Sequence, residues 1–168
     1  MERNLEEEFL KILSENKRIL YKIANVYCPD IEEKRDLFQE ITISLWKAFP
    51  YYRQEAKIST WIYKVALNTA ITNYRKNKRK IRSSPLNDRM FDQLTTHLSE
   101  NMEEEIKILY EAISKLLPVD KAIILLYLEE NSYQTISDIT GIPVGNIGMK
   151  IKRAKEKLLI LINKINNK

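Results

Sequence analysis

The amino-acid sequence predicts an all-α protein made of two small helical domains joined by a flexible linker. Apolar residues recur at steps of three and four along most of the chain, which is the spacing of buried faces on helices. All three glycines, Gly141, Gly145 and Gly148, lie within eight positions, so the rest of the chain lacks this helix-weakening residue. The five prolines fall where the apolar pattern breaks, and they divide the chain into about seven helices.

The first domain is expected to span residues 1–82, with three helices around one core. These helices are predicted over residues 5–27, 31–49 and 59–82. The side chains expected to be buried are, in order, Leu5, Phe9, Ile12, Leu13, Ile19, Leu20, Ile23, Leu37, Ile41, Leu45, Ala48, Ile62, Val65, Ala66 and Thr69.

Residues 83–102 contain few periodic apolar residues and mostly acidic charge, which predicts a linker between the domains. The second domain, residues 103–168, is expected to hold four helices. Its first helix is predicted to bury Ile106, Leu109, Ile113 and Leu116, and its second helix covers residues 119–130.

The last two helices are predicted to form a helix-turn-helix. Ser132 can cap a short helix, Gly141 can end it in the left-handed conformation, and Pro143 suits the start of the next helix. The long final helix is expected to bury the stripe Ile147, Ile151, Ala154, Leu158, Leu161 and Ile165. Its opposite face carries Asn146, Met149, Lys150, Arg153 and Lys157.

The charge of the final helix favours contact with DNA. From Gly141 to Lys168 there are seven basic residues and one acidic residue, which is typical of a surface that binds phosphates. An ordinary helical hairpin with a solvated basic face is the alternative interpretation of the same residues.

The third helix carries a second surface suited to nucleic acid. Its residues Trp61, Lys64, Asn68, Thr72 and Arg75 share one face, and no acidic residue occurs from Ala56 to Asn87. An aromatic ring, an amide and cations can stack on an unpaired base, bond its edge and hold the backbone, so a single strand is the expected ligand. Trp61 taken alone is equally well explained as a core residue.

Three segments resemble the extracytoplasmic-function sigma factors of bacterial RNA polymerase. DLFQEITISLWKAF (residues 36–49) and AKISTWIYKVALNTAITNYRKNKRK (residues 56–80) resemble their second conserved region. ISKLLPVDKAIILLYLEENSYQTISDITGIPVGNIGMKIKRAKEKL (residues 113–158) resembles the fourth. The resemblance covers most of the chain, in the right order, and it implies a role in initiating transcription.

The resemblance also implies partners and site residues. Core RNA polymerase would be bound by Asp36, Leu37, Gln39 and Glu40. The melted minus-ten promoter element would be bound by Tyr52, Arg53, Trp61, Lys64, Asn68, Thr72, Arg75, Lys76 and Arg79. The minus-thirty-five duplex would be bound by Tyr133, Gln134, Asn146, Met149, Lys150, Lys152, Arg153 and Lys155. An anti-sigma factor is a further partner expected by resemblance.

The recognition helix departs from the common family pattern. Asn146 can bond adenine and Met149 can contact a thymine methyl group, so fewer guanine contacts are expected. Gly148 removes a side chain and costs about 1 kcal/mol of helix propensity, which indicates a close approach of the backbone there.

Other classes of function are less well supported by the sequence. His97 is the single histidine, Cys28 the single cysteine, and neither belongs to a pattern typical of catalytic, metal or cofactor sites. No apolar run is long enough for a membrane span, and the acidic start lacks a signal-peptide pattern, so a cytoplasmic protein is expected. The alternatives to a sigma factor are an operator-binding helix-turn-helix regulator and a helical interaction module without a DNA role.

Overall fold

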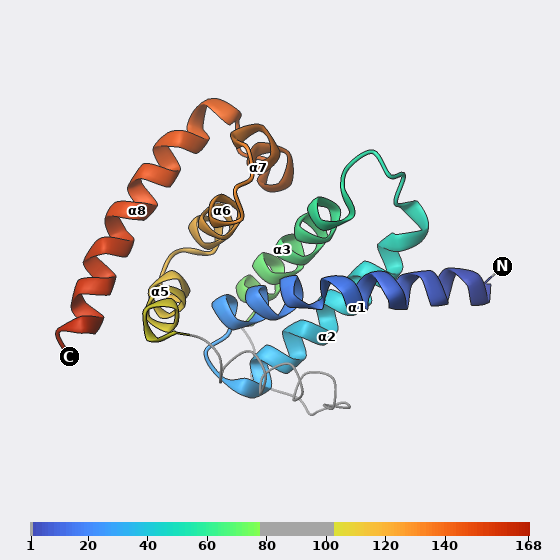
Figure 1. The fold of residues 1–168 in the computed structure, drawn as a ribbon, viewed down its shortest axis with the longest axis horizontal. Helices are drawn as coiled ribbons and strands as arrows, with labels where there is room; N and C mark the ends of the chain where they lie inside the picture. Colours follow the sequence, from blue (N-terminus) through green and yellow to red (C-terminus); the bar gives the residue numbers. More distant parts are fainter. Residues whose placement is uncertain (1, 78–102) are drawn as a thin grey trace.

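Seven α-helices and one short 3-10 helix make up residues 2–77 and 103–168, the part of the chain that a computed structural model describes. The elements, shown in Figure 1, are α1 (Glu2–Tyr27), α2 (Ile31–Ala48), η1 (Phe49–Tyr51), α3 (Ile58–Asn77), α5 (Glu104–Ser114), α6 (Pro118–Leu128), α7 (Tyr133–Thr140) and α8 (Val144–Asn166). Neither stretch contains a strand, so the all-α prediction is confirmed. The expected linker, Arg79 and His97 lie outside the described residues.

Helices α1, α2 and α3 pack around one apolar core, as the sequence predicts. Leu20, Ile23 and Ile41 are fully buried in it. Helix α2 begins where Asp30 accepts a hydrogen bond from the backbone N–H of Glu33 at 2.9 Å, which satisfies one of the donors left open at a helix start. These three helices form the first unit of the molecule.

The buried face of α3 is wider than the sequence pattern indicates. Tyr63, Leu67 and Ala70 are buried, whereas Val65 and Thr69, which were expected in the core, are only half-buried. The reason is that α3 is covered on two sides, by α1 and α2 and also by α6 and α7. A single apolar stripe cannot describe a helix with two neighbouring layers.

Helices α5 to α8 form the second unit, and its helix-turn-helix is built as predicted. Ser132 accepts a hydrogen bond from the backbone N–H of Thr135 at 3.1 Å, and Gly141 ends α7 with φ of 74°. Ile147, Ile151, Ala154 and Leu158 of α8 are buried, while Leu161 and Ile165 are half-buried near the end of the helix. Ile106, expected in the core, is 40% exposed because it lies in the first turn of α5.

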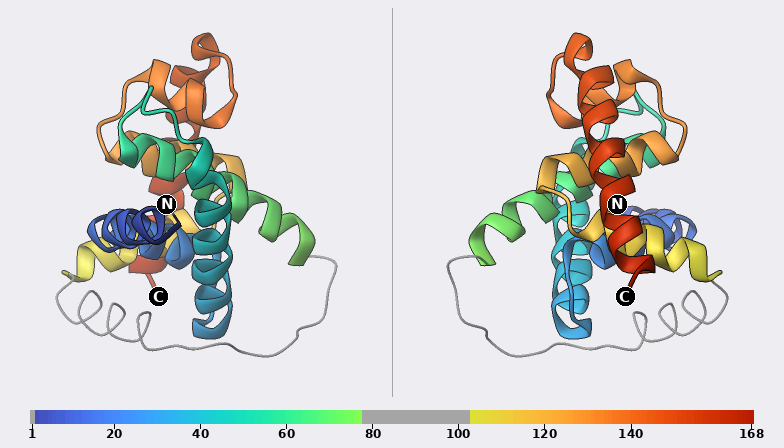
Figure 2. Two further views of the ribbon diagram at one scale, coloured as in Figure 1. Left: turned by 90° about the vertical axis from the view of Figure 1, so that its right-hand side faces the viewer. Right: turned by 90° about the vertical axis from the view of Figure 1, so that its left-hand side faces the viewer.

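The two units pack directly against each other. Helix α1 contacts α5 and α6, and α3 contacts α6 and α7. Lys22 of α1 pairs with Glu129 after α6, and the hydroxyl of Tyr27 donates a hydrogen bond to the carbonyl oxygen of Pro118 at 2.5 Å. Helix α8 lies on the outer side, with α6 and α7 between it and the first unit (Figures 1 and 2). The final helix is therefore open to solvent while α3 is partly covered.

Within the described residues, no helix combines the length and the apolar character that crossing a membrane requires.

Candidate nucleic-acid interface

The exposed face of α3 brings together most of the residues predicted to bind the minus-ten element. Lys64, Asn68 and Thr72 are exposed along it, and Arg75 and Lys76 extend the face toward the end of the helix. A shallow groove of about 430 Å³ runs beside this face and separates it from α2. Its lining residues are Glu40, Ile43, Ser44, Asn68, Thr69, Thr72, Asn73 and Lys76.

Trp61 has a different setting from the other residues of this face. It is half-buried and packs against the core, with its ring centroid 5.0 Å from that of Tyr52 and 6.2 Å from that of Phe49. The hydroxyl of Tyr52 donates to the carbonyl oxygen of Ala56 at 2.7 Å, which closes the loop of residues 52–57. Trp61 thus supports this loop as well as bordering the exposed face, and the core interpretation of Trp61 is partly correct.

The loop of residues 52–57 forms one wall of an open cavity of about 650 Å³, which we name the loop pocket. Gln54 in the loop has φ of 58°, a conformation that costs free energy in a residue other than glycine and that is typical of functional loops. The residues of the first unit that line the pocket are Tyr51, Tyr52, Arg53, Glu55, Ala56, Lys57, Thr60, Trp61 and Lys64. Tyr51, which precedes Tyr52 and Arg53 and is expected with them to border the strand-binding surface, is 81% exposed.

The solvent face of α8 carries the residues predicted to read duplex DNA. Asn146, Lys152, Arg153 and Lys155 are exposed, Met149 is 51% exposed and Lys150 is half-exposed. Helix α8 itself lies on the side of the second unit that is away from the first unit (Figures 1 and 2).

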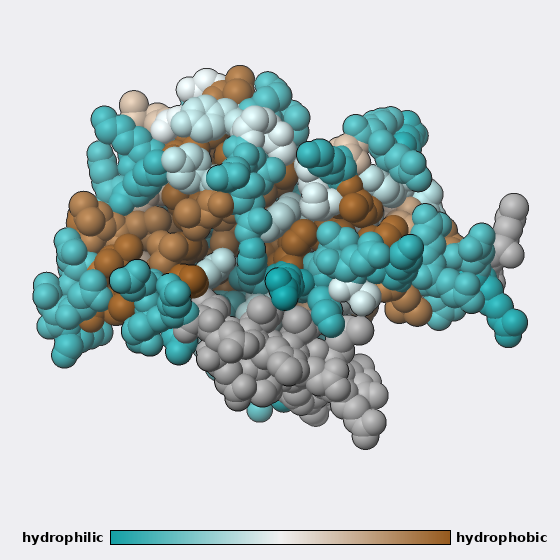
Figure 3. All heavy atoms as spheres, in the orientation of Figure 1, coloured by the Kyte–Doolittle hydropathy of each residue, from teal (hydrophilic) through white to brown (hydrophobic). Residues whose placement is uncertain are grey.

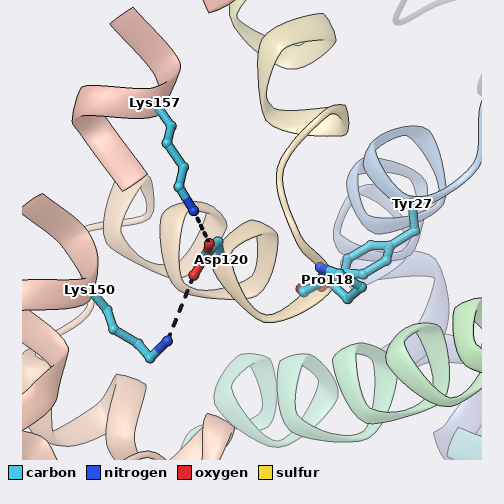
Figure 4. A network of polar contacts seen from close by, with 5 residues as sticks. All are labelled: Tyr27, Pro118, Asp120, Lys150 and Lys157. Atoms are coloured by element: carbon cyan, nitrogen blue, oxygen red, sulfur yellow. Dashed lines mark hydrogen bonds and ion pairs between the residues drawn. The ribbon is translucent and has the colours of Figure 1, made fainter. Parts of the chain in front are cut away.

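Helix α6 holds several of the α8 cations in place from beneath. The carboxylate of Asp120, a buried residue, lies 3.3 Å from the Nζ of Lys157 and 4.0 Å from that of Lys150 (Figure 4). The Nζ of Lys155 donates to the hydroxyl of Tyr127 at 2.7 Å and lies 4.2 Å from the centre of its ring. These contacts reduce the conformational freedom of the long lysine side chains. The periodicity of α8 could not identify Asp120 as the acidic partner of Lys150 and Lys157, because Asp120 lies about thirty residues earlier in the sequence.

Helix α7 meets α8 closely at one predicted residue. A Cβ atom built on Gly148 would lie 3.3 Å from Cε2 of Tyr133, so glycine makes room for this ring. The group that approaches Gly148 is therefore a side chain of the same helix-turn-helix. Gln134, the other predicted residue of α7, donates to the carboxylate of Asp138 at 2.9 Å.

The residues predicted to bind polymerase divide between surface and core. Asp36 and Glu40 are exposed and Gln39 is half-exposed, so these three can meet a partner. Leu37 is only 2% exposed and faces the α1–α3 core, so its side chain supports the helix from inside in this structure. Glu40 also accepts a hydrogen bond from the side-chain amide of Asn73, which ties the α2 surface to α3.

The described residues contain no side-chain grouping that matches those that bind metal ions. No group of three or more histidine, cysteine or acidic residues among them could hold a metal ion. Burial raises the pKa of the Cys28 thiol to about 12, so the thiol stays protonated near neutral pH and is a poor nucleophile. The fold and its surfaces define a helix-turn-helix nucleic-acid-binding protein with a second, basic and aromatic surface on a separate helix.

Comparisons with known proteins identify the family. A model of Sigma-70 region 2 matches residues 12–80, and a model of Sigma-70, region 4 matches residues 106–158. The chain is 28% identical over 155 residues to the RNA polymerase sigma factor SigV of Bacillus subtilis, covering 90% of this chain and 89% of the relative. It is 30% identical over 135 residues to the ECF RNA polymerase sigma-E factor of Haemophilus influenzae, covering 73% of this chain and 71% of the relative.

A solved structure has the same fold. The sigma factor RpoE from Bartonella quintana, in a co-crystal with the anti-sigma factor NepR, matches with a TM-score of 0.67 and 18% identity over 96% of this chain and 98% of that chain. The present chain belongs to the extracytoplasmic-function sigma factors of the sigma-70 family. It is a sigma factor, and its function lies in promoter recognition.

Proposed function

We propose that this sigma factor divides promoter recognition between two surfaces. The face of α3 and the loop of residues 52–57 hold the melted minus-ten element as a single strand, and α8 reads the minus-thirty-five element as duplex. The observation that carries this division is the difference between the two surfaces. The α3 surface combines aromatic rings in contact with each other, an exposed amide at Asn68 and a pocket, which suit unpaired bases. The α8 surface is a basic helix following a tight turn, which suits the major groove.

The division implies that residues 1–82 bind core RNA polymerase and the minus-ten element, and that residues 103–168 bind the minus-thirty-five element. Asp36, Gln39 and Glu40 are the proposed polymerase contacts on α2, because their polar side chains reach the surface on one stretch of helix. Leu37 supports that stretch from the core. The protein acts in this proposal by binding rather than by catalysis, in the cytoplasm with the polymerase.

An anti-sigma factor is a further proposed partner. The Bartonella quintana structure contains such an inhibitor, and the second unit of this chain exposes several large apolar residues, Ile106, Leu117, Leu159 and Ile160. Figure 3 shows apolar side chains gathered on the face formed by the helices of this unit. Exposed apolar surface of this kind is typical of a site for a protein partner.

Run-off transcription with purified core polymerase and fragmented genomic DNA from the source organism tests the proposal. Discrete transcripts that depend on this protein are expected, and they would reveal the promoter sequence. Once a promoter is known, permanganate reactivity of its unpaired thymines measures melting and a footprint measures duplex binding.

Matched variants separate the two surfaces. Asn68→Ala should lower melting about tenfold or more while polymerase binding is retained, because an amide bonded to a base edge contributes about 1–3 kcal/mol. Asn163→Ala, an exposed amide at the far end of α8, is the control. Arg153→Ala should weaken the upstream footprint, with exposed Arg18→Ala as its control. Unchanged melting in Asn68→Ala, or an unchanged upstream footprint in Arg153→Ala, would contradict the corresponding assignment.

The polymerase contact has its own test. The double change Asp36→Ala and Gln39→Ala should reduce association with core polymerase while the circular dichroism spectrum stays helical. Unchanged affinity would place the contact elsewhere.

A further inference from the structure

The start of the recognition helix exposes large apolar side chains within a basic surface. Met149 of α8 is exposed, and Tyr133 at the start of α7 is 46% exposed. The cations Lys152 and Arg153 are exposed on the same part of α8. An apolar side chain on a surface proposed to bind DNA gains stability on binding only where an apolar group of the DNA covers it. The DNA group that meets Tyr133 and Met149 is therefore expected to be apolar.

Tyr133 belongs to α7 but its ring is directed toward α8. A Cβ atom built on Gly148 would lie 3.3 Å from Cε2 of this ring, so the ring lies directly beside the helix backbone at Gly148. Thr135 and Asp138, which line the loop pocket, lie on a different side of α7. Helices α7 and α8 meet at one end of the second unit (Figure 1). The absence of a side chain at residue 148 thus decides where the ring of Tyr133 lies.

The helical repeat places a second glycine between this ring and Met149. Gly145 precedes Gly148 by three residues and Met149 by four, so these three residues share one face of α8. Nothing lies within 4 Å of a Cβ atom built on Gly145. The ring of Tyr133 and the side chain of Met149 therefore border a stretch of backbone without side chains, which lets a base edge approach the helix closely. We name the arrangement of Tyr133, Gly145, Gly148 and Met149 the apolar notch.

The chemistry of the notch matches one group in the major groove of DNA. The C5 methyl group of thymine is apolar, whereas the other bases present mainly hydrogen-bond donors and acceptors there. Asn146 is exposed next to Gly145, and its amide can bond both N6 and N7 of adenine. An amide beside an apolar notch fits A·T pairs, with the amide toward adenine and the notch toward the thymine methyl group.

We propose that the apolar notch recognises thymine by its methyl group, and that Tyr133 is a specificity-determining residue placed there by Gly148. This inference rests on the proposed reading of the minus-thirty-five duplex by α8. Contacts of the neighbouring cations with phosphates carry no sequence information directly, so the notch and Asn146 set the base preference. Burial of one methyl group in the notch should favour thymine over uracil about fourfold, because these two bases differ in this group alone.

Replacing thymine with deoxyuridine tests the inference without altering the protein. Holoenzyme assembled from this chain and purified core polymerase selects duplexes from a pool with a random segment, copied once with thymidine triphosphate and once with deoxyuridine triphosphate. The thymidine pool should yield an upstream motif rich in A·T pairs. Deoxyuridine is then placed at one thymine of this motif at a time, and at the position that meets the notch it should weaken binding about fourfold. In a G·C pair at that position, 5-methylcytosine should bind more tightly than cytosine, because it restores only the methyl group.

Variants of the protein connect the methyl preference to the notch. Tyr133→Ala should lower the ratio of the uracil and thymine dissociation constants toward one, whereas Tyr133→Phe keeps the ring and should retain the ratio. Gly148→Ala places a Cβ atom 3.3 Å from the ring and displaces it, so the ratio should fall here too. Leu159→Ala, which changes an exposed apolar residue on the same helix, is the control. Because the readout is a ratio of two affinities, partial unfolding of a variant cannot imitate the result.

Gly145→Ala separates recognition from stability. The added methyl group has nothing within 4 Å and replaces a residue with poor helix propensity, so the midpoint of urea unfolding should rise. The same methyl group occupies the floor of the notch, so the affinity for the thymine duplex should fall about fourfold while the affinity for the uracil duplex changes less. A stabilised variant that loses thymine preference cannot owe this loss to unfolding.

Each other outcome overturns a definite part of the reasoning. An upstream motif bound equally well with thymine and with uracil at every position would overturn recognition of the methyl group, while duplex reading by α8 would stand. A thymine preference that persists in Tyr133→Ala and Gly148→Ala would place the methyl contact outside the notch and refute the inference. If neither pool yields an upstream duplex motif, the proposed duplex reading fails together with the inference that rests on it.

Discussion

Replacing Asp120 with asparagine should loosen the support of the recognition helix. The Asp120 carboxylate lies 3.3 Å from the Nζ of Lys157 and 4.0 Å from that of Lys150. At an effective dielectric constant of about 20, these attractions are about 5 and 4 kcal/mol before solvation is considered. The two lysine side chains are 52% and 41% exposed, so the net contribution falls to about 0.5–1 kcal/mol each.

The position of Asp120 in the first turn of α6 adds about 0.3–1 kcal/mol through the helix dipole. Asp120→Asn should therefore lower the free energy of unfolding by about 2 kcal/mol and the melting temperature by roughly 4–8 °C. Thermal unfolding followed by circular dichroism measures this change. Asp138→Asn, an exposed carboxylate on α7, is the control and should change stability by less than about 0.5 kcal/mol.

Salt dependence provides the decisive check on Asp120. Because its partners are half-exposed, the difference from the wild-type chain should shrink in about 1 M salt, where the screening length is about 3 Å. An unchanged melting temperature, or a loss that is the same at low and high salt, would refute the electrostatic account.

Three further predictions concern stability. Gly141→Ala should destabilise the chain by about 1–2 kcal/mol because φ is 74° there. Gly145→Ala should stabilise α8 by up to about 1 kcal/mol, because nothing lies within 4 Å of the added Cβ. Urea unfolding should therefore show changes of opposite sign in the free energy of unfolding of these two variants. Ser132→Ala should cost about 1 kcal/mol by removing the cap of α7, and Ser14→Ala on the exposed face of α1 should cost much less. Burial raises the pKa of Cys28 to about 12 and also raises the pKa of Tyr27, so above about pH 9 the unfolded chain binds fewer protons than the folded chain. The free energy of unfolding should then fall as pH rises, and Tyr27→Phe should reduce that slope in urea titrations at pH 9–11.

The helix-turn-helix was predictable because its signals are local. Ser132 caps the residue three positions away, and Gly141 adopts a conformation that its own lack of a side chain permits. The buried stripe of α8 follows from the helical repeat, which places Ile147, Ile151 and Ala154 on one face. Such features depend on a few neighbouring residues, so they can be inferred before any long-range contact is known.

Long-range packing decided the features that the sequence pattern left open or misplaced. Leu37 lies within a motif that resembles a polymerase contact, but its side chain is buried in the core formed by α1, α2 and α3. Trp61 lies on the expected face of α3, yet its half-buried ring also packs against Tyr52 and Phe49. Tyr63 is buried because α3 is covered by helices from both units.

The packing of the two units is the largest difference between sequence and structure. Composition and periodicity define which residues are apolar or charged within each unit, and they established the helices, the helix-turn-helix and the two basic surfaces. They contain no information on which surface of one unit meets the other, because that choice depends on the shapes and charges of side chains far apart in the chain. The pairs Lys22–Glu129 and Tyr27–Pro118, and the placement of α7 over the loop pocket, exist only once the tertiary structure has formed.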